Sequence, residues 1–210
     1  MPVCKICFCD IKMDSLHYFL KPCICQQCFN TFDPKLKSFK DNGISYFYIY
    51  EYDELIKKLL FQFKGCYDIE LKDVFLERFK YLLKLKYHDY ILVPLPSTKS
   101  DDELRGFNHV VEIFKTISLP MERCIFKKVD FKQSDLSFKE RIKVKDKLGI
   151  KDGEKLTNKK ILIVDDVITS GSSIKAAIEL VSMYHPKTIK VLVLARNMHF
   201  INQNKKKGDK

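Results

Sequence analysis

One stretch, residues 161–173, constrains the fold more than any other part of the chain. It begins with the apolar run 161–164, which indicates a strand buried on both faces, as parallel sheets require. Two carboxylates, Asp165 and Asp166, follow where that strand should end. A loop of small residues, 169–173, then leads into an amphipathic helix. This order predicts an α/β fold with a ligand site at the end of the strand.

The loop has the features of a phosphate site. Backbone N–H groups at a helix N-terminus lack intrahelical partners and carry the positive end of the dipole, so they favour an anion. Gly171 permits a positive φ or a close backbone approach. The two aspartates suit sugar hydroxyls, which donate to carboxylates. The pattern predicts a sugar 5′-phosphate as the ligand. The alternative is an ordinary turn in which Thr169 or Ser170 caps the helix and the carboxylates are solvated.

The same stretch resembles the phosphoribosyl pyrophosphate (PRPP) motif of type I phosphoribosyltransferases, in which a hydrophobic run, two acids and a Thr/Ser/Gly loop follow one another. By this resemblance Asp165 and Asp166 are the catalytic pair, and they would hold the ribose 2′ and 3′ hydroxyls. The 5′-phosphate would lie on the loop residues, which are Thr169, Ser170, Gly171, Ser172 and Ser173.

Six of the eight cysteines fall within the first 28 residues. Two Cys-x2-Cys pairs, Cys4 with Cys7 and Cys25 with Cys28, are separated by 17 residues, a spacing typical of a structural four-thiolate Zn²⁺ site. Such an ion closes a segment that is too small to bury its own core. Disulfides are disfavoured because nothing in the sequence directs the chain to an oxidising compartment. We therefore predict a zinc ribbon.

The choice of zinc ligands stays open at this point. Cys9 and Cys23 each lie two residues from a predicted ligand and can replace it, and His17 lies in the intervening loop. The two remaining thiols would then be free or would support the site.

Charge and hydropathy limit the partners. The formal net charge is +11, of which four lysines and one aspartate place +3 in residues 205–210, leaving +8 for the rest. That excess suits phosphorylated metabolites or nucleic acid, although a lysine-rich composition explains it equally well. No run of 18 apolar residues occurs, and the first residues lack the apolar core of a signal peptide. We expect a cytoplasmic protein without membrane insertion.

Hydrophobic periodicity predicts the other elements. Residues 33–38 are expected to be a polar joint, Arg196 is expected to face solvent, and 202–210 form a basic tail that should be disordered. The predicted strands are 44–50, 90–96, 121–129 and 188–196, and the predicted helices are 52–64, 70–87, 104–114 and one that starts at Ser137 with a capping box.

A second anion site is predicted after the strand 90–96. In a doubly wound sheet its loop, residues 97–100, opens on the same edge as the loop after Val164. Lys99 would stabilise the departing pyrophosphate, whereas the alternative is an ordinary βα loop. Arg105 joins the predicted PRPP ligands because a chain with 33 Lys and only 5 Arg should keep Arg for bidentate contacts.

A wider resemblance covers nearly the whole chain. The cysteine ribbon at 4–28, the segment that ends at Phe63 and Lys64, the Arg-Gly-Phe-Asn segment 105–108, and the PRPP motif together resemble the ComF competence-protein family. A Gln133-x2-Leu136-x4-Arg141 stretch adds to this resemblance, although Val144 stands where the family has Asn. Type I phosphoribosyltransferases close a mobile loop over the site in this part of the chain, so a lid that carries Lys127, Lys128, Gln133 or Arg141 is one expectation. The alternative, which we favour, is a solvated charged helix.

The resemblance implies a PRPP-binding protein that acts in natural competence, in the uptake of transforming single-stranded DNA with a helicase-like ATPase as partner. It also implies structural Zn²⁺ and a Mg²⁺ that accompanies PRPP. Phe29 and Phe32 near the ribbon are compatible with contact to single-stranded DNA, or with simple packing. The alternatives are an active phosphoribosyltransferase in nucleotide salvage, and a zinc-dependent adaptor with a vestigial site.

The expected architecture is a type I phosphoribosyltransferase-like parallel sheet flanked by helices, with a small N-terminal zinc-ribbon-like module. The expected domains are the ribbon at 1–34, the phosphoribosyltransferase-like domain at 40–200, and the basic tail at 201–210.

Overall fold

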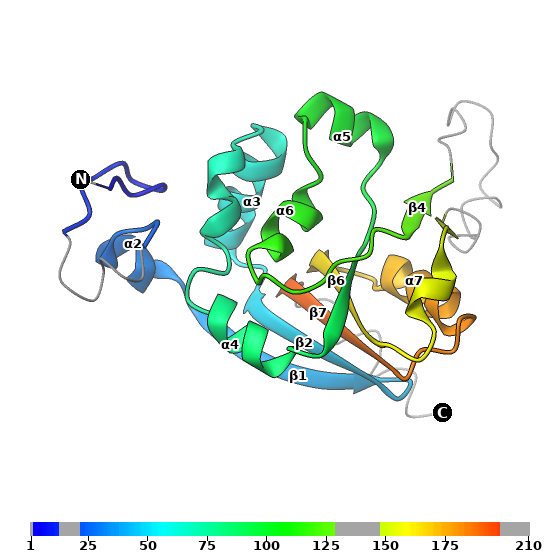
Figure 1. Ribbon diagram of the computed structural model, residues 1–210. Helices are drawn as coiled ribbons and strands as arrows, with labels where there is room; N and C mark the ends of the chain where they lie inside the picture. The colour runs from blue at the N-terminus through cyan, green and yellow to red at the C-terminus, as the bar shows by residue number, and fades with distance from the viewer. Residues whose placement is uncertain (1, 13–21, 129–147, 198–210) are drawn as a thin grey trace, which may run out of the picture.

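A five-stranded sheet organises the computed structural model, which describes residues 2–12, 22–128 and 148–197 (Figure 1). The strand order is β1-β2-β7-β6-β3, with β1 antiparallel to β2 and the other neighbours parallel. The strands are β1 Pro34–Asp41, β2 Ile44–Glu51, β7 Thr188–Arg196, β6 Lys160–Ile168 and β3 Tyr90–Pro94. This is the α/β architecture, with a mainly parallel sheet, that the sequence predicts.

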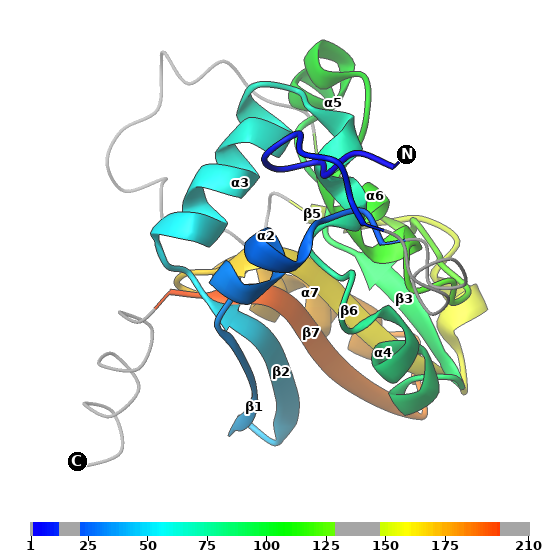
Figure 2. The same cartoon turned by 90° about the vertical axis from the view of Figure 1, so that its left-hand side faces the viewer.

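Successive residues of β6 enter two different cores, because neighbouring side chains of a strand point to opposite faces. Leu162 and Val164 pack with α3 (Glu54–Gly65), α4 (Lys80–Lys86) and α6 (His109–Lys115). Ile161 and Ile163 pack instead with α7 (Ser172–Ser182) on the opposite face. Figures 1 and 2 show these helices on the two sides of the sheet. Burial on both faces explains why the run 161–164 contains no polar residue.

The N-terminal residues pack against the same core as α3 and α6. Cys4, Ile24 and Phe32 are buried there, and α2 (Gln26–Thr31) leads directly into β1. Lys5 Nζ lies 3.0 Å from Asp73 Oδ2, which ties the ribbon to the short 3₁₀ helix η1 (Ile69–Asp73).

Two sequence predictions are wrong, one at the edge strand of the sheet and one in the connection between β2 and β3. Residues 33–38 are not a joint, because most of them belong to β1, an edge strand with mainly half-exposed and exposed residues. Residues 70–87 do not form one helix, since η1 and α4 are separated by turns at 74–79. Phe75 and Leu76 in that stretch are fully buried, so tertiary packing overrides the local helical pattern.

The region after β3 contains two helices where one was expected. The first, α5 (Lys99–Arg105), ends at Gly106, which has a left-handed φ of 81°. The second, α6, begins after Asn108, whose side chain accepts a hydrogen bond from Val111 N. A glycine with positive φ followed closely by an N-cap residue stops one helix and starts another.

The expected strand 121–129 is shorter in the structure. Only β4 (Ile125–Lys127) is formed, and it pairs antiparallel with β5 (Leu148–Ile150), while η4 (Gly153–Leu156) follows. Of the residues predicted for a lid, Lys127 ends β4 and Lys128 follows it, whereas Gln133 and Arg141 lie outside the described residues. The capping box at Ser137, His17 and the basic tail at 201–210 also lie outside them.

Arg196 does not face solvent as expected. It is 9% exposed, and its Cζ atom lies 4.1 Å from the centroid of the Tyr48 ring.

Within the described ranges, no helix has the length and hydropathy needed to span a bilayer.

Candidate functional site

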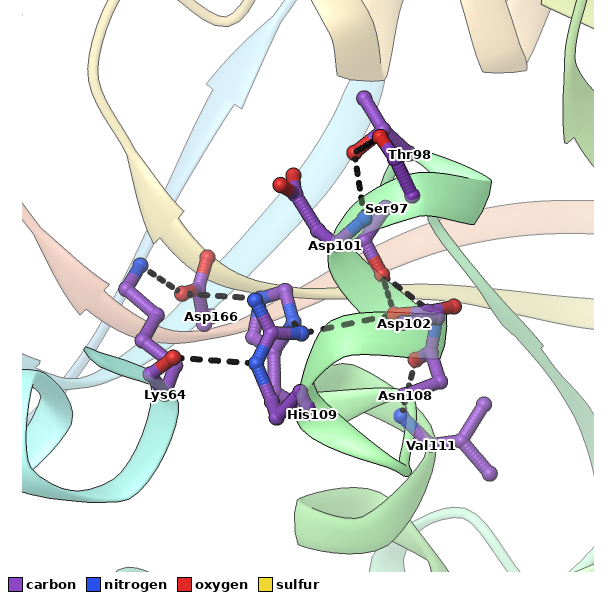
Figure 3. Close-up of polar contacts among 11 residues, drawn as sticks. Lys64, Ser97, Thr98, Asp101, Asp102, Asn108, His109, Val111 and Asp166 are labelled. Carbon is purple, nitrogen blue, oxygen red and sulfur yellow. Dashed lines mark hydrogen bonds and ion pairs between the residues drawn. The ribbon is translucent and has the colours of Figure 1, made fainter. Parts of the chain in front are cut away.

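The acid pair lies on β6, and Asp166 is the better-held member. Its Oδ2 atom is 2.6 Å from Lys64 Nζ and 3.2 Å from His109 Nε2, and its Oδ1 atom accepts from Val167 N at 2.7 Å (Figure 3). Only 7% of Asp166 is exposed. A buried carboxylate is therefore held by a lysine of α3, an imidazole of α6 and the backbone N–H of the next residue, Val167.

The two carboxyls have opposite electrostatics. Burial favours the protonated form of Asp166, but the His109 hydrogen bond and the Lys64 charge outweigh it and hold the pKa well below its usual range. Burial raises the pKa of Asp165, and the neighbouring Asp166 charge raises it further. At neutral pH the negative charge therefore belongs firmly to Asp166, while ionisation of Asp165 is opposed.

The loop after β6 exposes the N-terminus of α7. Gly171 occupies the N-cap position with a left-handed φ of 71° and has no side chain with which to cap the helix. Ser170 Oγ accepts a long hydrogen bond from Ser172 N at 3.4 Å. The first helical bond runs from Lys175 N to Gly171 O at 2.9 Å, which leaves the amides of Ser173 and Ile174 directed out of the helix end. The N-cap position is therefore Gly171 and not Thr169 or Ser170, although Ser170 covers the amide of Ser172 through its long bond.

The Arg-Gly-Phe-Asn segment is the junction of α5 and α6. Arg105 Nε donates to Lys64 O at 3.0 Å, and Arg105 Nη1 lies 3.4 Å from Asp102 Oδ1 and 3.2 Å from His109 Nδ1. The ring of Phe107 packs against Phe63, with centroids 5.1 Å apart. The segment thus fixes the C-terminal end of α3 against the acid pair.

Asn108 ties the loop after β3 to the same junction. Its Nδ2 atom donates to Ser97 Oγ at 2.8 Å and to Asp102 Oδ2 at 2.9 Å, while Ser97 Oγ also donates to Asp102 (Figure 3). Thr98 caps α5 by accepting from Asp101 N at 3.2 Å. The loop that the sequence assigns to pyrophosphate is therefore held by side-chain hydrogen bonds.

These elements enclose a cavity of about 440 Å³. Both acids line it together with Ser97 and Ser173. The basic and imidazole side chains in its wall are Lys64, Arg105, His109 and Lys127. Asp101 lines it too, so three carboxyls face three cationic side chains. The cationic side chains beside a helix N-terminus suit a polyanion, and the carboxyls suit its hydroxyls.

The predicted ligand residues are not all in that cavity. Asp165, Asp166, Arg105 and Ser173 line it. Thr169, Ser170 and Gly171 lie on the adjoining loop, and Ser172 begins α7. Lys99 lines a neighbouring cavity of about 830 Å³ that shares Ser97 with the first. Its side chain is 91% exposed and lies 3.5 Å from Glu103.

Sequence reasoning did not assign Lys64 or His109 to the site. Lys64 is 102 residues from Asp166, so only the fold shows that they meet. His109 directly follows the Arg-Gly-Phe-Asn segment, and that position was the available signal.

The four cysteines predicted as metal ligands come together. The Sγ atoms of Cys4, Cys7, Cys25 and Cys28 all lie within 4.8 Å of one another. Four thiolates about 2.3 Å from one tetrahedral ion would be about 3.8 Å apart, so this group can hold a metal ion such as zinc. The backbone N–H of Cys28 lowers the pKa of Cys25 to about 6, which favours the thiolate.

The two alternative cysteines have other surroundings. Cys23 Sγ donates to Glu77 Oε2 at 3.3 Å, and burial together with the Glu77 charge raises its pKa. Cys9 is exposed, and Cys7 Sγ donates to its sulfur at 3.3 Å. Cys23 is therefore directed at the main domain, whereas Cys9 adjoins the four-cysteine group.

The aromatic residues proposed for DNA contact are both packed. Phe32 is 6% exposed and its ring centroid lies 5.7 Å from that of Tyr50. Phe29 is covered by the guanidinium of Arg78, with Cζ 3.6 Å from the ring centroid. Both rings act in packing in this structure.

Comparisons with known proteins agree with this geometry. A family model described as a phosphoribosyl transferase domain matches residues 105–209. Competence protein ComFC of Streptococcus pneumoniae (strain ATCC BAA-255 / R6) is 28% identical over 154 residues, which are 73% of this chain and 69% of that protein. Competence protein ComFC of Bacillus subtilis (strain 168) is 27% identical over 131 residues, which are 61% of this chain and 54% of that protein.

Among solved structures, a hypoxanthine-guanine phosphoribosyltransferase from Bacillus anthracis aligns with 61% of this chain and 70% of its own, at 13% identity and a TM-score of 0.40. The family match spans the α5–α6 junction, the acid pair and the helix that follows it. The chain belongs to the ComF family and carries a phosphoribosyl transferase domain.

Proposed function

We propose that the cavity beside β6 binds PRPP. The 5′-phosphate would lie on the amides and hydroxyls of residues 169–173, and the ribose hydroxyls would donate to Asp165 and Asp166. Arg105 and Lys99 would contact the phosphates, with Lys99 moving to the pyrophosphate from its exposed position. The observation that supports this most strongly is that the acid pair and Ser173, in the first turn of α7, line one cavity, while the N-cap residue Gly171 has no side chain to cover the helix N-terminus.

The chemistry of such a site is substitution at ribose C1, where positive charge grows as pyrophosphate leaves. The chain need only orient the sugar and neutralise the departing anion, so no nucleophilic side chain is required. When bound with PRPP, Mg²⁺ would neutralise pyrophosphate charge, and Asp165 and Asp166 would help to place it through the ribose hydroxyls that they hold. The cationic side chains that line the cavity, Lys64 and Arg105 among them, would also attract the pyrophosphate.

We further propose that the ion held by the four cysteines is Zn²⁺ and that its role is structural. All four positions are thiols, so no site for a catalytic water is left. The ion would fix the segment on which Lys5 and Cys23 meet η1 and Glu77.

In the cell, we propose a role in natural competence, as the names of the two relatives suggest. The chain would handle transforming single-stranded DNA in the cytoplasm together with a helicase-like ATPase. The net charge of +11 supports contact with nucleic acid. An active salvage enzyme is the competing function, and the intact acid pair and loop favour it equally.

Thermal unfolding with and without PRPP and Mg²⁺ tests the binding proposal. We expect PRPP to raise the melting temperature of the wild type, because a ligand that binds only the folded state stabilises it. The double substitution Asp165→Asn with Asp166→Asn should abolish the shift, whereas Glu54→Gln, which removes an exposed charge on α3, should preserve it. The absence of any shift in the wild type would contradict the proposal.

Two assays separate the cellular roles. Release of pyrophosphate from PRPP across a panel of nucleobases would favour the salvage enzyme. Binding of single-stranded DNA, with an affinity that falls steeply as salt rises, would favour the competence role.

A further inference from the structure

Arg105, His109 and Asp166 have little exposed side-chain surface and form a continuous chain of contacts, called the relay below. Arg105 Nη1 lies 3.2 Å from His109 Nδ1, and His109 Nε2 lies 3.2 Å from Asp166 Oδ2. The exposed fractions of the three side chains are 8%, 12% and 9%. Figure 3 shows His109 between the Asp166 carboxylate and Asp102 of α5. Water is largely excluded from these contacts, so their donors and acceptors must match.

The geometry fixes the histidine tautomer. A guanidinium keeps its protons in proteins and has only donors, so His109 Nδ1 must accept from Arg105 and carry no proton. The ring proton then sits on Nε2, where it donates to Asp166. A doubly protonated ring would direct an N–H at the Arg105 donor, which this arrangement disfavours.

We propose that His109 is a positioning residue, which Arg105 holds as the neutral Nε2–H tautomer so that it orients the Asp166 carboxylate for a ligand. Lys64 and His109 together use both lone pairs of Oδ2. Only Oδ1, which also accepts from Val167 N, remains for an incoming hydroxyl. The role of His109 in ligand binding rests on the proposed sugar-phosphate site. The tautomer of His109 and its effect on Asp166 do not depend on that site.

The relay also connects the two halves of the proposed site. The Nη1 group of Arg105 that donates to His109 also reaches Asp102, which accepts from Ser97 and Asn108. The loop after β3 is therefore linked through Arg105 and His109 to the acid on β6. The charged and titratable groups that line the cavity with Asp166 are Lys64 of α3, Asp101 and Arg105 of α5, His109 of α6, Lys127 of β4 and Asp165 of β6.

Nuclear magnetic resonance on the labelled full-length protein tests the inference without activity. At neutral pH, the side-chain ¹⁵N signals of His109 should show a neutral ring with its proton on Nε2. The spectrum of His109→Gln identifies these signals by their loss. A ring protonated on Nδ1, or on both nitrogens, would overturn the proposal.

The ¹³C signal of the Asp166 carboxyl supplies the second measurement. In His109→Leu, which removes the donor, its titration midpoint should rise above that of the wild type. In His109→Gln, which keeps an amide donor near the place of Nε2, it should stay close to the wild-type value. An unchanged midpoint in the leucine variant would overturn the proposal.

Binding of ribose 5-phosphate tests whether His109 orients Asp166 for a ligand. Its affinity should fall about tenfold in His109→Leu and recover in His109→Gln, since a hydrogen bond to a charged group is lost and then restored. Equal affinities in all three proteins would contradict the orienting role. If the wild type does not bind ribose 5-phosphate, the proposed function fails, and the two spectroscopic results alone decide the inference.

Discussion

The four-cysteine group and the acid pair both place like groups side by side, but they differ in what compensates them. The thiols hydrogen-bond mainly to one another, with Cys7 Sγ 3.6 Å from Cys25 Sγ. Asp166, by contrast, already has Lys64 and His109 within hydrogen-bond distance. If its thiols are ionised, the first region would need an added ion to balance their charge. The second has its counter-charge in the chain and is arranged before any ligand binds.

Removal of the metal should give the largest effect. We expect Cys4→Ser to lose the ion, because Cys4 is a buried member of the group, and structural zinc supplies about 10–16 kcal/mol in isolated fingers. Metal analysis and amide hydrogen exchange of residues 22–32 would show loss of the ion and faster exchange. Cys9→Ser is the control and should keep the ion. Full metal content in Cys4→Ser would mean that the ligands are misassigned.

Substitution of the two aspartates should change stability in opposite directions. Asp166→Asn should lower the free energy of unfolding by about 3 kcal/mol, because it breaks a buried pair and leaves Lys64 uncompensated. Asp165→Asn should raise it by about 1 kcal/mol, because ionisation of Asp165 is opposed in the fold. Urea denaturation at pH 7 measures both values. Equal changes in the two variants would contradict the assigned asymmetry.

The pH dependence should sharpen the same contrast. The folded-state pKa of Asp166 is lowered, so its stabilising effect is full above the unfolded value of about 3.9 and is lost as the pH falls through the folded pKa. The folded-state pKa of Asp165 is raised, so this residue lowers the free energy of unfolding. Its destabilising effect is full above the folded-state pKa and vanishes as the pH falls below the unfolded value of about 3.9. Asp165→Asn should therefore raise the free energy of unfolding by less at pH 4 than at pH 8, and urea denaturation at a series of pH values measures this difference.

Lys64→Met should have a smaller effect than Asp166→Asn. The lysine is 36% exposed, so solvent replaces part of its interaction, and we expect a loss of about 2 kcal/mol. Lys57→Met, which removes the exposed pair with Glu54, is the matched control and should lie within about 0.5 kcal/mol of the wild type. The same urea titration compares them, and equal losses would show that Lys64 does not support Asp166.

Lys99→Ala should leave stability unchanged within about 0.5 kcal/mol, because its pair with Glu103 is solvent-exposed. It should weaken PRPP binding while leaving ribose 5-phosphate binding intact, since its proposed contact is with pyrophosphate. Calorimetric titration of both ligands measures the difference. A parallel loss for the two ligands would place Lys99 elsewhere in the site.

The sequence predicted the parts of the molecule whose determinants are contiguous. The strand before Asp165, the helix after Ser173 and the Cys-x2-Cys pairs each depend on residues close in the chain. The strand β1 was missed because its lysine-rich, mainly exposed residues resemble a linker. The helix predicted for 70–87 was wrong because the core takes Phe75 and Leu76 in a different geometry.

Within the candidate site, the sequence placed the acids and the loop next to each other but could not place Lys64 and His109. Those contacts join α3 and α6 to β6, and their existence depends on how Gly106 and Asn108 break the chain into two helices. Pairing across 102 residues is a property of the packed fold and not of local pattern.

A crystal structure of the protein with ribose 5-phosphate tests the central claim most directly. The account predicts the phosphate on the amides and hydroxyls of residues 169–173, with the ribose hydroxyls on Asp165 and on Oδ1 of Asp166. A ligand bound elsewhere, with Asp166 still held by Lys64 and His109 and the helix N-terminus free of phosphate, would contradict it.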